Sequence, residues 1–283
     1  IVEIIKAVVA RVKLIVLRDI SNFISAADLR KIHLTPYTLD FSHIDSPSLP
    51  NAGRNGILKF HNISTENIID MSFTVEKGEC VVLLDMNNTV LIDIMKLMNG
   101  ETKPLSGDIF LDGANYTKKA SELKKGICFI QENPIQSMLF QERSYINNLC
   151  FLVDKKLPHW WLNKNIRKSI IQEYEPLVGE DIYANYISDL APRSLYNLVY
   201  YRVHLYHPKV VFCMQPFSDA DMYLRHHLIQ LIDQLRKKNI TVIILAVSIS
   251  DSLVVADRLM VVEQGKLKNE YHSEKFHSFR ASQ

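Results

Sequence analysis

A short apolar run that leads into a polar stretch has the layout of a strand entering a phosphate-binding loop. The run is Cys80–Leu84, and Asp85 begins the stretch that follows. A working loop of this kind reads G-x-x-x-x-G-K-[ST]. Its glycines let the backbone approach the ligand, its lysine meets the β- and γ-phosphates, and its hydroxyl holds Mg²⁺. The chemistry that this spacing would serve is therefore the binding and hydrolysis of a nucleoside triphosphate.

The side chains that such a loop needs are missing here. The two glycine positions hold Asp85 and Val90, the lysine position holds Leu91, and the hydroxyl position holds Ile92. Leucine removes the cation, and a β-branched valine is a poor host for the positive φ angles that aim N–H groups at an anion. We take the vestigial loop to comprise Asp85, Asn87, Asn88, Thr89, Val90, Leu91, Ile92 and Asp93.

Charge at the loop argues further against a triphosphate. Asp85 and Asp93 place two carboxylates beside the position that the phosphates would take. Two like unit charges about 5 Å apart repel by roughly 3 kcal/mol at an effective dielectric constant near 20. For Asp93 we prefer a plainer interpretation, a solvated residue in the first turn of a helix, where carboxylates are favoured. Asn88 tolerates the left-handed conformation, so a distorted set of N–H groups is still expected.

Apolar patterns and turn residues predict the elements around the loop. The expected strands are 57–63, 69–76, 80–84, 127–132, 209–213, 240–247 and a closing pair in 256–267; the expected helices include 94–98, 194–207 and 221–238. Residues 240–247 form a nearly unbroken apolar run, which is typical of a strand buried on both faces of a parallel sheet.

Two short motifs stand between these elements. Lys77-Gly78-Glu79 precedes the buried strand, and Lys103-Pro104-Leu105-Ser106-Gly107 follows the helix. In this order the segments resemble the ATP-binding cassette of ABC transporters over residues 57–270. The resemblance implies an α/β fold: a P-loop NTPase-like cassette with a RecA-like core, an antiparallel β subdomain and a helical subdomain inserted at about 133–195. The polar tail, residues 271–283, is expected to be loose.

The resemblance also locates the remaining catalytic positions. Met214 and Gln215 stand where the family's Walker B strand carries an Asp that holds Mg²⁺ and a Glu that polarises water. Methionine is no ligand for a hard cation, and glutamine cannot accept the proton of water. Val247 stands at the position of the switch histidine.

The signature loop L-S-G-G-Q, which completes the partner cassette's site in the family, is altered as well. It reads Leu190, Ala191, Pro192, Arg193 and Ser194. Proline removes a backbone donor, whereas Arg193 could still contact a phosphate, although a surface role is the more frequent one. Gln131 occupies the Q-loop position; alternatively, Gln131 and Glu132 match the first two residues of the P-E-D-R string of second cassettes. Asp221 keeps the D-loop carboxylate.

The start of the chain carries an internal repeat. Lys13–Ile20 resembles Arg258–Gly265, so we expect residues 1–30 to be the tail of a preceding cassette and the turn-rich residues 31–56 to be a linker. An unrelated amphipathic helix and strand is the alternative for residues 1–30. Because the chain begins with Ile, we expect the back half of a tandem-cassette protein, similar to the ATPase subunits of ribose/galactose/nucleoside-type importers.

Composition excludes several classes of protein. The net charge is +2, which predicts no broad basic surface for nucleic acid. The apolar stretch nearest to a membrane span, Ile1–Leu17, is interrupted by charges and has the wrong layout for a signal peptide. The four cysteines lie in apolar runs without C-x-x-C spacing, which indicates buried thiols and no zinc or redox site.

Losses at the catalytic positions and a well-kept frame predict a pseudo-ATPase cassette with no bound cofactor, where the family uses ATP and Mg²⁺. It would pair with an intact cassette and, through its helical subdomain, with a membrane permease on the inner face of the plasma membrane. A regulatory or scaffold module without a transport role is an alternative, since fold alone does not exclude it. A working ATPase with an atypical site is the third hypothesis for the function.

Overall fold

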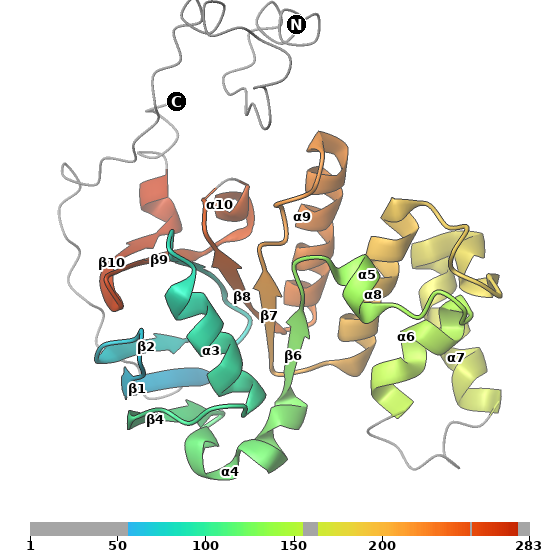
Figure 1. Cartoon of the computed structure of the whole chain (residues 1–283). Helices are drawn as coiled ribbons and strands as arrows, with labels where there is room; N and C mark the ends of the chain where they lie inside the picture. Colours follow the sequence, from blue (N-terminus) through green and yellow to red (C-terminus); the bar gives the residue numbers. More distant parts are fainter. Residues whose placement is uncertain (1–55, 155–163, 250, 277–283) are drawn as a thin grey trace, which may run out of the picture. The chain divides into compact units, whose positions relative to one another are not determined.

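Two sheets organise the part of the chain that the computed structural model describes, namely residues 56–154, 164–249 and 251–276 (Figure 1). All of these residues belong to one compact unit. The predicted tail of a preceding cassette, the linker up to residue 55 and residues 277–283 lie outside the described residues. The prediction of a loose tail from residue 271 is wrong for its first part, since a strand extends to His272 and both Tyr271 and Phe276 are buried.

The larger sheet has six strands in the order β10-β9-β3-β8-β7-β6. They are β3 (Cys80–Leu84), β6 (Ile127–Ile130), β7 (Val210–Met214), β8 (Thr241–Ala246), β9 (Arg258–Glu263) and β10 (Lys266–His272). β10 runs antiparallel to β9, and the other neighbours are parallel. Since parallel strands end at the same edge, the segments that follow β3, β8, β7 and β6 meet there. Every residue of β3 and β8 is buried, as the apolar runs predicted.

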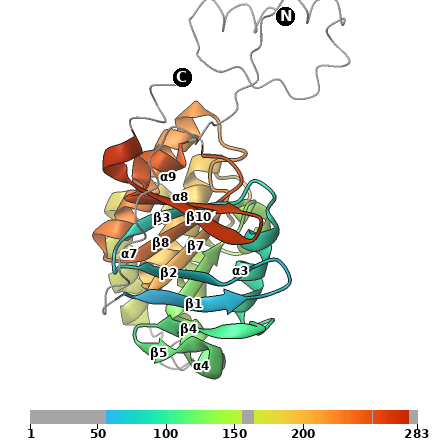
Figure 2. The ribbon, with the colours of Figure 1, turned by 90° about the vertical axis from the view of Figure 1, so that its left-hand side faces the viewer.

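The smaller sheet is antiparallel, in the order β2-β1-β4-β5 (Figure 2). Its strands are β1 (Leu58–Ser64), β2 (Met71–Val75), β4 (Ser106–Leu111) and β5 (Ala114–Asn115). Gly107 on β4 has φ = 85°, and a Cβ there would collide with the backbone oxygens of His61 and Asn62. Only glycine allows β4 to lie so close to β1, which explains the glycine after Lys103-Pro104-Leu105-Ser106.

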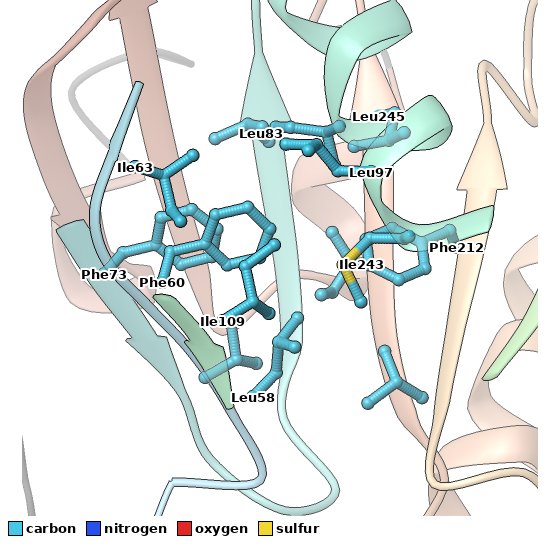
Figure 3. Packing of buried hydrophobic residues seen from close by; sticks show 14 of the residues in the cluster. Leu58, Phe60, Ile63, Phe73, Leu83, Leu97, Ile109, Phe212, Ile243 and Leu245 are labelled. Carbon is cyan, nitrogen blue, oxygen red and sulfur yellow. The ribbon is translucent and has the colours of Figure 1, made fainter. Parts of the chain in front are cut away.

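Helix α3 (Thr89–Asn99) packs between the two sheets. Leu58, Phe60 and Ile109 approach it from the small sheet, and Phe212 and Ile243 from the large one (Figure 3). The rings of Phe60 and Phe73 stack with centroids 4.5 Å apart. Gly100 ends the helix in a left-handed conformation at φ = 72°. The sequence prediction lacked helix α4 (Tyr116–Leu123), which follows β5.

A group of helices follows β6, as the inserted helical subdomain predicted: α5 (Pro134–Met138), α6 (Tyr145–Asp154), α7 (Lys164–Val178) and α8 (Pro192–Tyr206). The buried Arg202 on α8 connects this helix to α5 and α6. Its guanidinium donates to the backbone oxygens of Asn148 and Met138 and to the side-chain oxygen of Asn148. Burial lowers the pKa of Arg202 to about 10. Two further helices flank the large sheet: α9 (Met222–Lys237) and the short α10 (Ser252–Val255).

A buried ion cluster lies at the start of β9 in the large sheet. Arg258 on β9 places Nε 2.7 Å from Oε1 of Glu79 and Nη1 2.6 Å from Oε1 of Glu270. Its Nη2 also donates to the backbone oxygen of Thr74. Burial alone would lower the pKa of Arg258, but the two carboxylates outweigh burial and raise it. The cluster thus ties β9 to β10 and to the turn between β2 and β3.

Candidate functional site

The carboxyl edge of the large sheet carries most of the residues that the sequence singled out. Leu84 pairs with Ala246, and Met214 pairs with Leu245, so β3, β8 and β7 end level with one another. The residues that follow these ends are Asp85, Val247 and Gln215. Gln131 and Glu132 follow β6 at the same edge, and both are exposed.

Asp85 is the first residue of the vestigial loop, and it is buried. The residue is 3% exposed. Its Oδ1 accepts a hydrogen bond from the backbone N–H of Asn87 at 3.0 Å, and its Oδ2 accepts one from Val90 at 2.8 Å. Its backbone oxygen accepts the N–H of Asn88 at 3.1 Å. One carboxylate therefore bridges the loop and the first turn of α3.

The expected left-handed residue of the loop is confirmed at Asn88. It has φ = 59° and ψ = 7° and lies directly before α3. Val90 needs no positive φ, because it already lies inside the helix. Asn88 thus supplies a left-handed turn directly before the helix, although the glycines of the phosphate-loop pattern are gone.

The position of the phosphate-binding lysine belongs to the hydrophobic core. Leu91 is fully buried, and Val90 beside it is 1% exposed. Both belong to the cluster that joins α3 to the two sheets. Thr89 and Ile92 are exposed, so the helix start presents a hydroxyl and an aliphatic chain to solvent.

Asp93 corrects the sequence interpretation. It lies in the second turn of α3 and is half-buried, not a solvated residue of the first turn. Its Oδ2 accepts hydrogen bonds from the hydroxyl of Thr65 and from the side-chain amide of Asn67, the latter at 3.2 Å. Asp93 therefore anchors the connection between β1 and β2. Its carboxylate faces that connection and not the vestigial loop.

The end of β7 offers no acidic group. Met214 is half-buried and packs against the core, and Gln215 has φ = 40° and donates its backbone N–H to Leu245 at 2.9 Å. Asp221 follows, but it caps α9 and accepts the N–H of Leu224 at 2.8 Å. Val247 is half-buried and also packs against the core.

The signature-loop residues lie at the start of a helix in the group inserted after β6. Leu190 and Ala191 lead into α8, where Pro192 is the first helical residue. The N–H that proline lacks is one that a helix leaves unpaired at this position anyway. Arg193 is exposed. α8 packs against α6 and α9, so these residues belong to the helical part of the fold.

These side chains do not fit ATP with Mg²⁺. A triphosphate needs free N–H groups and a cation at the loop, where Asp85 already takes two N–H groups and Leu91 brings no charge. Mg²⁺ prefers carboxylate oxygens, and β7 ends on a thioether and an amide.

The inward role of Asp85 is what sequence reasoning missed. The charge was weighed only as repulsion toward a ligand. The available signal was the residue type: aspartate directly after a strand and before a helix commonly hydrogen-bonds backbone N–H groups two or more residues ahead.

The relatives of this chain in sequence are ATP-binding proteins of importers. No family model matches the chain. The ribose import ATP-binding protein RbsA of Caldanaerobacter subterraneus is 22% identical over 225 residues, covering 77% of this chain and 45% of that protein. The Fe(3+) ions import ATP-binding protein FbpC of Vibrio cholerae is 24% identical over 200 residues, covering 70% and 55%. The chain thus spans about half the length of these relatives.

A solved structure shares the fold. That of cbiO1 from Clostridium perfringens, part of the ABC transporter complex cbiONQ, has a TM-score of 0.69 at 18% identity and covers 81% of this chain and 93% of that one. Among the residues that the structure describes, no helix is both long and apolar enough to cross a membrane. The chain is therefore related to the ATP-binding cassettes of ABC transporters and has their fold.

Proposed function

We propose that this chain is a pseudo-ATPase cassette of an ABC importer, most similar in kind to those for ribose, galactose or nucleosides. It pairs with an intact cassette and, through its helical part, with a membrane permease on the inner face of the plasma membrane. The partner cassette hydrolyses ATP, and this chain contributes a rigid half of the assembly without nucleotide chemistry.

The observation that carries this proposal is the burial of Leu91. The residue at the lysine position is fully buried in the core that holds α3 between the sheets. Phosphoryl transfer depends on a set of preorganised charges around the triphosphate. With leucine in the core and Met214 and Gln215 at the end of β7, that set has neither its cation nor its carboxylates.

The importer role is supported by the relatives, whose names include import of ribose and of Fe(3+) ions. The helices inserted after β6 support the proposed contact with a permease, and Asp221 keeps the carboxylate of the D-loop of the family that the sequence resembles. Since cassettes do not contact cargo in the family that the sequence resembles, the proposal of a sugar cargo rests on the ribose importers among those relatives.

Membrane association of the tagged chain tests the assembly. The chain is expressed in its native host, membranes are solubilised in mild detergent, and the eluate is analysed by mass spectrometry. We expect co-elution in fixed ratio with a multi-spanning permease and an intact cassette, unchanged when ATP is depleted by apyrase. Recovery of the chain free of membranes, or co-elution that disappears with ATP, would contradict the proposal.

A further inference from the structure

The carboxylate of Asp85 is buried at the start of α3, where both of its oxygens accept hydrogen bonds. We infer that the Asp85 carboxylate is a built-in anion, which takes the place that a bound phosphate would have at this helix N-terminus. The inference rests on the proposed function and deepens it, because it explains how the loop stays folded without a ligand.

The two oxygens of the Asp85 carboxylate accept backbone N–H groups that lie at the start of α3. Backbone N–H groups at a helix N-terminus bind anions because they are unpaired and lie at the positive end of the helix dipole. Here Oδ1 takes the N–H of Asn87 at 3.0 Å and Oδ2 takes that of Val90 at 2.8 Å. The side chain is 3% exposed, so the carboxylate fills the loop from within and does not reach solvent.

Loop geometry fits the same interpretation. Asn88 supplies the left-handed turn at φ = 59°, and its N–H closes the loop onto the backbone oxygen of Asp85 at 3.1 Å. The backbone N–H of Asp85 is held by Ala246 of β8 at 3.0 Å. The carboxylate is thereby fixed to the sheet, and an external anion would meet a negative charge in the position that it needs.

Chemical rescue tests this inference. The variant Asp85→Gly removes the carboxylate and restores the glycine of the phosphate-loop pattern. We expect its Tm to fall by about 5 °C, since two charge-assisted hydrogen bonds are lost. Inorganic phosphate should then raise the Tm of the variant in a saturable manner and leave the wild-type Tm unchanged, against sodium chloride of equal ionic strength.

Two further variants make the test specific. Asp85→Ala removes the carboxylate without adding the backbone freedom of glycine. Because we assign the effect to loss of the carboxylate, phosphate should raise the Tm of this variant as well. Asp221→Gly is the matched control, because Asp221 is a helix-capping carboxylate that accepts one N–H at an exposed site. Its Tm should show no saturable response to phosphate.

The outcomes separate this inference from the proposed function. Saturable stabilisation of both Asp85 variants but not of wild type supports the built-in anion. Equal responses of wild type and variants, or none in either Asp85 variant, would overturn it and leave the pseudo-ATPase proposal intact. Binding of ATP by the wild-type chain would instead overturn the proposed function.

Discussion

Replacing Leu91 with lysine is expected to lower the free energy of unfolding by about 3–5 kcal/mol without creating an ATP site. The substitution restores the residue that a phosphate-binding loop carries. In this fold, however, the side chain lies in the core between α3 and the sheets, where Leu91 is fully buried. An ammonium group there is uncompensated, and desolvation favours its neutral form. Urea denaturation of the Leu91→Lys variant measures the loss.

The matched control is Leu91→Met, which keeps the volume and apolar character of the side chain and should cost less than about 1.5 kcal/mol. A lysine variant as stable as wild type, or one that gains affinity for ATP, would show that the side chain reaches the loop. In that event Leu91 would be a lost ligand and not a core residue.

The second large effect is expected at the ion cluster of the large sheet. Arg258→Leu removes the cation that lies between Glu79 and Glu270. Two carboxylates then remain close together in a buried setting, and the backbone oxygen of Thr74 loses a donor. Breaking a buried ion pair by removing one partner costs about 3–5 kcal/mol, which equilibrium unfolding of this variant should reproduce.

A double variant isolates the charge contribution. Adding Glu270→Gln to Arg258→Leu removes one of the two opposed carboxylates and should restore part of the lost stability. The exposed ion pair between Lys209 and Asp112 is the comparison, because Lys209→Met should cost no more than about 1 kcal/mol. If Arg258→Leu cost as little as Lys209→Met, the cluster would have no structural role.

Much of the fold could be predicted from the sequence because apolar patterns report burial. Cys80–Leu84 is apolar throughout and forms the central strand β3 with those bounds, and 240–247 contains β8. Helix α4 escaped prediction because it is short and rich in lysine, and of its residues only Tyr116 is buried. Its position follows from tertiary contacts: Tyr116 donates its hydroxyl to the backbone oxygen of Met98 at the end of α3.

The site was harder to predict than the fold. Residue types alone revealed which catalytic groups are absent, since Leu91 and Met214 cannot do the chemistry of lysine and aspartate. They did not reveal what the substitutes do. Asp85 and Asp93 are both acidic and eight positions apart, yet one fills the loop and the other holds Thr65 and Asn67. Only the path of the backbone distinguishes the two.

Equilibrium binding of ATP with Mg²⁺ to the purified chain is the most direct test of a cassette without nucleotide chemistry. Isothermal titration at millimolar nucleotide, with thermal shift alongside, should detect no binding and no stabilisation, since Asp85 and Leu91 exclude the triphosphate. A ligand at 100 times its Kd would stabilise the fold by about 2.7 kcal/mol. Saturable binding with a shift of that size would contradict the account.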